Sequence, residues 1–200
     1  MFAGKTITLI RRVKGLEYLG KRGVAIKPVI DNRYSETAIV SHDGKRLEAK
    51  VLVHDTNDLP DYLLQNIDFL AIDEFQFFTG RFPYMLLPLL AEGVIRKMMI
   101  AGLDTDWQGV PFGPMPYFLA FADDVTKLHA RCAVCGGTAT RSHLLNAPGA
   151  GETTQDTQVI IGGEEQYEPR CLSCFMHAQK ARMIAKLAVD STPEPVVLSA

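Results

Sequence analysis

The stretch that decides the fold is Met1-Phe2-Ala3-Gly4-Lys5-Thr6. Its Gly-Lys-Thr precedes a helix with a periodic apolar face. The second half of a phosphate-binding loop has the same sequence at the start of a helix. In such a loop the backbone N–H groups face the phosphates, the lysine reaches the β and γ oxygens, and the threonine helps to hold Mg²⁺. The full motif has a further glycine upstream, separated from Gly4 by four residues, which this stretch lacks. Taken alone, Gly-Lys-Thr is therefore more often a helix start that binds no ligand.

Apolar patterning downstream predicts an α/β fold with a mainly parallel sheet. Apolar residues at positions 7, 10, 13, 16 and 19 indicate an amphipathic helix that ends at Gly20. Short apolar runs at 23–31, 67–72 and 94–101 predict buried parallel strands, and the crossovers between them should be right-handed. We further expect a hairpin over 37–53, helices over 58–66, 82–92 and up to 122, and a strand over 125–131.

Acidic residues follow the predicted strands, at the sheet edge where open α/β folds bind ligands. Asp31 follows the first strand, and Asp73 and Glu74 follow the second. Since adjacent residues at a strand end point in different directions, one carboxylate can face Mg²⁺ while the other faces a nucleophile. The alternative is a pair of solvated acids. Phe77, Phe78, Trp107 and Phe112 occur in loops beside these acids and favour a flat apolar slot, although such residues more often form core.

The four cysteines form two Cys-x-x-Cys pairs and predict a structural zinc site. The ligands are Cys132, Cys135, Cys171 and Cys174. Four thiolates leave no open coordination position, so the metal would be structural, and it would pin both ends of the intervening segment as a lasso. Two redox dithiols are the alternative, but neither pair opens a helix in a thioredoxin-like context.

Composition excludes several classes of protein. The 21 Lys and Arg residues against 23 Asp and Glu residues give a net charge of −2, which disfavours a zinc-ribbon nucleic-acid binder or an anionic-membrane binder. No run approaches 18 apolar residues and no leader pattern is visible, so we expect a cytoplasmic protein without a membrane partner. The tail from residue 190 has two prolines and no periodicity, which is typical of disorder.

Taken together, these motifs resemble the type II thymidine kinases over roughly residues 1 to 180. The matching blocks are residues 1–6, 31–35, 73–78, 103–113, 161–167 and both Cys-x-x-Cys pairs. The resemblance implies a P-loop (RecA-like) kinase domain, here residues 1–123, and a zinc-binding lasso domain with a C-terminal helix, here 124–189. It also implies transfer of the ATP γ-phosphate to the 5′-hydroxyl of thymidine, with Mg²⁺ and structural Zn²⁺, and usually a homotetramer.

The resemblance assigns roles to individual residues. Glu74 resembles the catalytic base. The contacts to ATP and Mg²⁺ would be Ala3, Gly4, Lys5, Thr6, Asp31, Arg33, Asp73 and Gln76. The contacts to thymidine would be Phe77, Leu103, Trp107, Phe112, Ser142, Ile160, Gly162 and Tyr167. In the lasso the family contacts the base mainly with backbone groups, so the side chains there say less about which nucleoside is bound.

The sequence departs from the family in two places. The family has a strand and Gly-Pro before the position of Met1, so we expect the natural protein to start upstream. If the chain starts at Met1, the alternative is a catalytically impaired nucleotide-binding zinc protein. Trp107 stands where the family usually has phenylalanine, which would narrow the slot without changing the chemistry.

Overall fold

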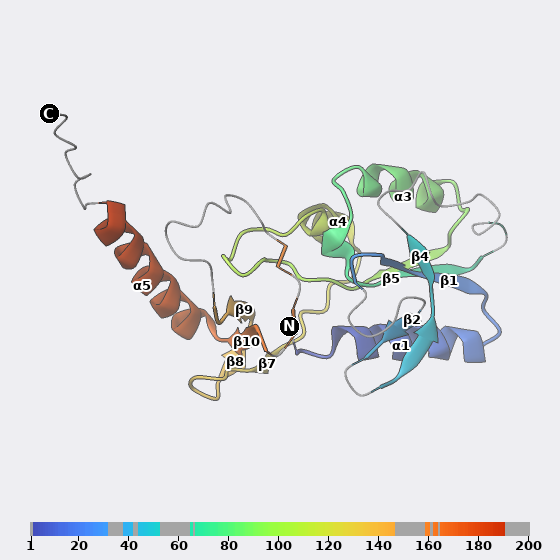
Figure 1. The fold of residues 1–200 in the computed structure, drawn as a ribbon. Coiled ribbons are helices and arrows are strands. Elements are labelled where there is room, and N and C mark those ends of the chain that lie inside the picture. Colours follow the sequence, from blue (N-terminus) through green and yellow to red (C-terminus); the bar gives the residue numbers. More distant parts are fainter. Residues whose placement is uncertain are drawn as a thin grey trace, which may run out of the picture.

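The computed structural model describes residues 2–31, 38–41, 44–52, 65, 67–146, 159–160, 162–163 and 165–190 (Figure 1). Its centre is a parallel sheet in the order β4-β1-β5-β6. The strands are β1 (Gly23–Pro28), β4 (Lys50–Leu52), β5 (Phe69–Ile72) and β6 (Lys97–Ile100). Ile26, Ile72 and Ile100 lie side by side across three strands, so the carboxyl ends of these strands meet at one edge. This confirms the predicted α/β fold with a parallel sheet.

Helices cover both faces of this sheet, because β5 is apolar on both sides. Phe69 and Ala71 face α1 (Lys5–Tyr18), where Leu9, Ile10 and Val13 are buried. Leu70 and Ile72 face the opposite layer, formed by α3 (Phe82–Ala91) and α4 (Met115–Phe121). Burying one such large side chain contributes roughly 1.5–3 kcal/mol. The two clusters together fix the sheet edge on which the acidic residues stand.

Helix α1 begins and ends at glycines with left-handed backbone. Gly4 is its N-cap, with φ 75°, and among the described residues no side chain caps the first turn. Gly20, with φ 73°, follows the last turn, where the Gly20 N–H donates to the Glu17 carbonyl and the Lys21 N–H to the Leu16 carbonyl. Glycine tolerates this conformation without a Cβ clash. The N–H groups at the start of α1 are therefore not occupied by a side-chain cap.

A second group of elements, which we call the cysteine lobe, consists of two short hairpins and the start of α5 (Leu172–Asp190). The hairpins are β7 (Ala130–Arg131) with β8 (Thr138–Ala139), and β9 (Arg141–Leu144) with β10 (Tyr167–Arg170). Two backbone hydrogen bonds join them, from the Ala133 N–H to the Pro169 carbonyl and from the Thr140 N–H to the Arg170 carbonyl. Helix α5 begins immediately after β10 (Figure 1).

Two strand predictions need correction. The hairpin predicted over 37–53 is confined to β2 (Ala38–Val40) and β3 (Arg46–Glu48), because residues 50–52 leave it to pair with β1 as β4. Of the strand predicted over 125–131, only Ala130–Arg131 forms β7, since no strand in the described part of the chain lies beside residues 125–129. The helix predicted over 58–66 and the tail lie outside the described residues, and the domain boundaries stay predictions.

None of the helices in the described part of the chain is both long and apolar enough to span a membrane.

Candidate active site

The first turn of α1 faces the carboxyl end of β5. Lys5 and Thr6 are both half-buried there, and the Thr6 hydroxyl is close enough to the Asp73 carboxylate to lower its pKa. This turn offers uncapped backbone N–H groups, a lysine ammonium and the positive end of a 14-residue helix. Such a combination attracts phosphate. Lys5 also lines the pocket described below, so the first turn of α1 adjoins that pocket. We call this turn, with Asp73, the phosphate side of the site.

Asp73 is almost fully buried, with 3% of its surface exposed, at the point where β5 ends. Its N–H donates to the Ile26 carbonyl at 3.0 Å, which holds it beside β1. Burial raises the pKa of Asp73 to about 7 from an ordinary 3.8, and the Glu74 charge adds to this, while Thr6 and Lys5 oppose it. Its Oδ1 atom has no hydrogen-bond partner among the described residues. A buried carboxylate oxygen beside a threonine hydroxyl suits Mg²⁺, so the residues present fit this ion.

Glu74 turns the chain out of the strand. It adopts φ 48° and ψ 43°, a left-handed conformation that is costly for a residue with a Cβ, and the short 3₁₀ turn η2 (Phe75–Phe77) follows. The turn separates the Glu74 carboxylate from that of Asp73, and Glu74 lines the pocket whereas Asp73 does not. The two carboxylates therefore lie on different sides of the site, as expected for adjacent residues at a strand end.

Gln76 holds the Glu74 side chain in place. Its Nε2 donates to Glu74 Oε2 at 2.5 Å, and its Oε1 accepts from the Leu103 N–H at 2.9 Å. The side chain is 2% exposed, and a Cβ on either Gly102 or Gly113 would lie within 3 Å of Gln76 atoms. Both ends of the amide are thus engaged within the protein. The family resemblance assigns Gln76 to ATP and Mg²⁺, but these contacts point to a positioning role.

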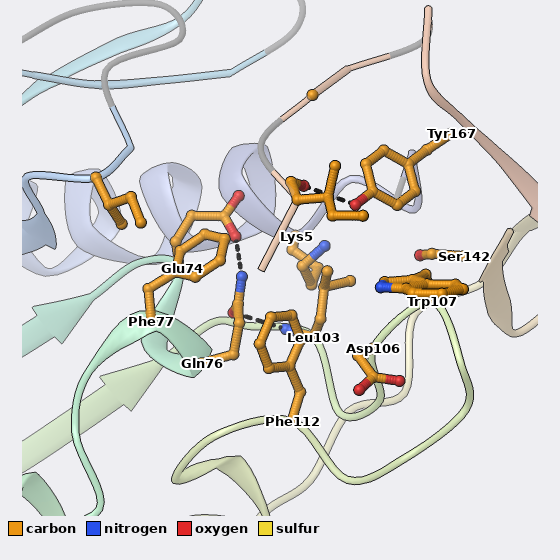
Figure 2. Close-up of a pocket in the computed structure, with 13 residues that line it drawn as sticks. Lys5, Glu74, Gln76, Phe77, Leu103, Asp106, Trp107, Phe112, Ser142 and Tyr167 are labelled. Carbon is orange, nitrogen blue, oxygen red and sulfur yellow. Dashed lines mark hydrogen bonds between the residues drawn. The ribbon is translucent and has the colours of Figure 1, made fainter. Parts of the chain in front are cut away.

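One pocket gathers all eight residues predicted to contact thymidine, together with the positioned acid (Figure 2). Phe77 and Phe112 meet edge to face, with ring centroids 5.7 Å apart, and Tyr167 donates its hydroxyl to the Ile160 carbonyl at 2.6 Å. The complete lining is Lys5, Ile30, Glu74, Gln76, Phe77, Leu103, Asp106, Trp107, Phe112, Ser142, Ile160, Gly162 and Tyr167. The pocket thus joins an apolar aromatic slot to a carboxylate and an ammonium group.

Two lining residues, Ile30 and Asp106, were not among the predicted site residues. Ile30 precedes Asp31 after β1, and Asp106 precedes Trp107. Their positions next to predicted site residues could have indicated that they line the pocket. Phe78 is core rather than slot, because it stacks on Phe82 with centroids 4.2 Å apart. Arg33 lies outside the described residues. The remaining predicted phosphate-side residues stand outside the pocket lining, at the start of α1 and after β1 and β5: Ala3, Gly4, Thr6, Asp31 and Asp73.

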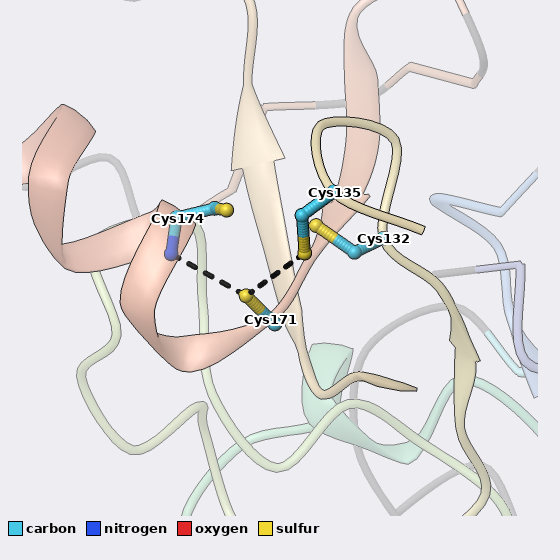
Figure 3. A group of neighbouring side chains, drawn as sticks. All are labelled: Cys132, Cys135, Cys171 and Cys174. Carbon is cyan, nitrogen blue, oxygen red and sulfur yellow. Dashed lines mark hydrogen bonds between the residues drawn. The ribbon is translucent and has the colours of Figure 1, made fainter. Parts of the chain in front are cut away.

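The four cysteines converge into one cluster (Figure 3), with their Sγ atoms all within 4.8 Å of one another. Cys135 Sγ and Cys171 Sγ lie 3.7 Å apart, and the Cys174 N–H points at Cys171 Sγ at 3.4 Å. A tetrahedral zinc–thiolate site with bonds of about 2.3 Å requires sulfur separations of about 3.8 Å. Backbone N–H groups from Cys135 and Cys171 lower the pKa of Cys132 to about 6. The donor set and its spacing therefore fit zinc, and no cysteine is paired in a disulfide.

Comparison with known families decides the assignment. The family model for thymidine kinase matches residues 1–175. The chain belongs to the thymidine kinase family. Membership makes it a kinase, that is, a transferase of nucleotide metabolism. The match includes the first turn of α1, both acids, every residue that lines the pocket, and all four cysteines. Most of α5 lies beyond it.

Proposed function

We propose that this thymidine kinase family member transfers the γ-phosphate of ATP to the 5′-hydroxyl of thymidine and yields thymidine monophosphate. The observation that carries the proposal is the pocket itself. Glu74 and Lys5 line the same cavity as the aromatic residues Phe77, Trp107 and Phe112. A flat apolar slot accepts a pyrimidine ring, and a carboxylate at its end can face the sugar hydroxyl.

In this proposal the phosphate side binds the donor. The N–H groups of the first turn of α1 and the Lys5 ammonium hold the β and γ phosphates, and Thr6 and Asp73 hold Mg²⁺. When bound, Mg²⁺ supplies charge neutralisation on the phosphate oxygens. Gly4 and Ala3 shape the approach to this turn, and Asp31 and Arg33 supply polar groups after β1. These roles are supported by the buried Asp73 Oδ1 atom and by the start of α1, neither of which has a side-chain partner among the described residues.

Glu74 acts as the base in the proposed transfer. A bond forms between O5′ of thymidine and the γ-phosphorus, the bond from that phosphorus to the β–γ bridging oxygen breaks, and the hydroxyl proton passes to the Glu74 carboxylate. Gln76 keeps one carboxylate oxygen fixed through its 2.5 Å hydrogen bond. In this proposal the Glu74 carboxylate faces the 5′-hydroxyl of the nucleoside. Ser142, Ile160, Gly162 and Tyr167 close over the base from the cysteine lobe and lasso side.

The proposal extends to the assembly of the protein. We propose a structural zinc ion on the four cysteines, a kinase domain over 1–123 and a lasso domain over 124–189. We also propose a cytoplasmic homotetramer, as the family resemblance implies. Size-exclusion chromatography with light scattering would test the tetramer, and metal analysis of the purified protein would test the zinc. A monomer, or a protein with less than about one zinc per chain, would contradict the respective statement.

Transfer of labelled phosphate from γ-labelled ATP to thymidine tests the function. Product should form only with Mg²⁺ and should form about 100-fold more slowly or worse with Glu74→Gln, while the exposed control Glu92→Gln should retain activity. Other deoxynucleosides should be offered in parallel, with deoxyuridine separating recognition of the 5-methyl group from recognition of the ring. ATP binding without any transfer by the wild-type protein would instead support a nucleotide-binding zinc protein and end the kinase proposal.

A further inference from the structure

The loop that carries Trp107 is internally ordered. The Phe112 N–H donates to the Asp104 carbonyl at 3.1 Å, and the Asp106 N–H donates to the Val110 carbonyl at 2.9 Å. The Asp106 Oδ1 atom accepts two more N–H groups at the tip, from Gln108 at 2.8 Å and from Val110 at 3.0 Å. These bonds make residues 104–112 a tight hairpin-like unit. Such a unit keeps its internal shape, so its placement in the site depends on its external contacts.

Two of those external contacts come from α5. Gln179 Nε2 donates to the Trp107 carbonyl at 2.9 Å, across 72 residues of sequence. The Phe175 side chain is 2% exposed and reaches the tip of the loop, where a Cβ on Gly109 would lie 3.1 Å from its ring. His143 packs against Phe175 as well, edge to face at 6.4 Å between ring centroids. The tip of the loop therefore rests on α5 through one hydrogen bond and one buried ring.

Helix α5 is itself anchored by the cysteine lobe. Its first turn contains Cys174, and the Phe175 N–H donates to the Cys171 carbonyl at 2.9 Å. The opposite end of the loop is tied separately, since Lys127 Nζ and Asp104 Oδ2 form an ion pair at 2.6 Å. The base of the loop is thus fixed by one contact and its tip by others. Of these contacts, the hydrogen bond from Gln179 is the one that involves a residue beyond the family match, which ends at residue 175.

We infer that Gln179, with Phe175, is a positioning residue for the acceptor slot, and that α5 beyond the last cysteine belongs to the functional site. Gln179 does not line the pocket, but it fixes the residue whose side chain does. Loss of the hydrogen bond should let the Trp107 side chain shift within the pocket. Nucleoside binding should then weaken, and ATP binding should stay unchanged. This inference deepens the proposed function and rests on it for the identity of the nucleoside.

The test uses Gln179→Ala and the isosteric Gln179→Glu, which keeps the size of the side chain but removes the donor. A neutral hydrogen bond contributes about 1 kcal/mol, so the KM for thymidine should rise about fivefold in Gln179→Ala. Gln179→Glu should cost at least as much, because a carboxylate would face a carbonyl. The KM for ATP and kcat should stay within about twofold. Lys180→Ala, on the exposed next residue of α5, is the matched control and should leave every parameter unchanged.

A second readout does not need activity. Trp107 is the only tryptophan in the chain, so its fluorescence reports directly on this loop. Emission wavelength and acrylamide quenching should change in Gln179→Ala and Phe175→Leu but not in Lys180→Ala. Unchanged Trp107 fluorescence in a folded Gln179→Ala protein would overturn the inference, as would equal increases of both KM values. Absence of any phosphoryl transfer in the wild type would refute the proposed function, while the fluorescence result would still decide whether α5 positions Trp107.

Discussion

The proposed phosphate side and the proposed acceptor side of the site are built in different ways. On the phosphate side, Thr6 and Asp73 belong to a helix and a strand end packed into the main core, and Asp73 is 3% exposed. On the acceptor side, Trp107, Ser142 and Tyr167 come from three separate segments that the cysteine lobe brings together. Once the sheet has folded, the first arrangement loses little further conformational entropy. The second depends on contacts far apart in sequence, so we expect it to be the softer half.

The largest effect should come from the residue at which both halves meet. Replacing Glu74 by glutamine keeps the size and one acceptor but removes the charge and the basicity. We expect kcat to fall by about 10²–10⁴-fold, toward the lower end because the transition state of phosphoryl transfer is loose. The KM for ATP should change little. Steady-state kinetics with pre-steady-state bursts would measure this.

Exposed Glu92 provides the control for Glu74, since Glu92→Gln alters the same functional group at the end of α3. A Glu74→Gln enzyme within a few-fold of the wild-type kcat, with chemistry shown to be rate-limiting, would remove Glu74 from the mechanism.

Removing zinc, or replacing Cys171 by serine, should weaken thymidine binding on the acceptor side without weakening ATP binding on the phosphate side. The cysteines bracket the segments that supply Ser142 and Tyr167, whereas the phosphate side stands on α1 and β5. Loss of two polar contacts at about 1–1.5 kcal/mol each predicts roughly 100-fold weaker thymidine binding, with ATP binding nearly unchanged. Calorimetric titration of each ligand would measure this. Ser173→Ala, on the exposed residue between the two ligands, is the control, and equal losses for thymidine and ATP would mean that zinc supports the whole fold.

The pH dependence of stability should report on the phosphate side. The pKa of Asp73 is raised from 3.8 to about 7, so between these values the folded chain holds a proton that the unfolded chain releases. Stability contributed by this group is therefore present at low pH and lost as pH rises. Without ligands, we expect the wild type to lose about 2–3 kcal/mol from pH 5 to pH 8 relative to Asp73→Asn. Denaturant titrations at several pH values would measure the free energy of unfolding of both proteins. If the pKa shift were absent, the two proteins would show the same dependence of this free energy on pH.

The smallest effect concerns the contact between the loop and the 3₁₀ turn. Gly113 has φ 50°, and a Cβ there would lie 2.1 Å from the Gln76 carbonyl oxygen. Gly93 has φ 73°, and a Cβ there would meet no atom within 4 Å, so Gly93→Ala measures backbone strain alone. Gly113→Ala should destabilise the protein by about 1–2 kcal/mol more than Gly93→Ala. Equal melting temperatures for the two variants would show that the loop relaxes away from η2 at no cost.

Sequence patterns predicted the strands and the acidic residues that follow them better than the long-range contacts that hold the loop carrying Trp107, for a physical reason. Apolar runs followed by Asp31 and Asp73 specify buried strands and their polar ends, because both signals are local in the chain. The ion-pair and amide contacts of Lys127 and Gln179 join residues 23 and 72 positions apart, and no local pattern reveals them. The strand expected over 125–131 failed similarly over residues 125–129, since a strand needs a neighbour as well as a suitable sequence.

The segment from Asp73 to Phe78 has a consequence for how this enzyme can evolve. Phe75 and Phe78 are buried in the core, Asp73 and Gln76 are buried polar residues, and Glu74 and Phe77 line the pocket. These six successive residues thus divide between the core, buried polar contacts and the pocket lining. If the proposed function is right, a change at one of them disturbs packing, metal binding or the base. New nucleoside preferences should therefore arise elsewhere, in the loop over 104–112 or on α5. Drift in those segments can reshape the acceptor slot while the machinery for phosphoryl transfer is inherited intact.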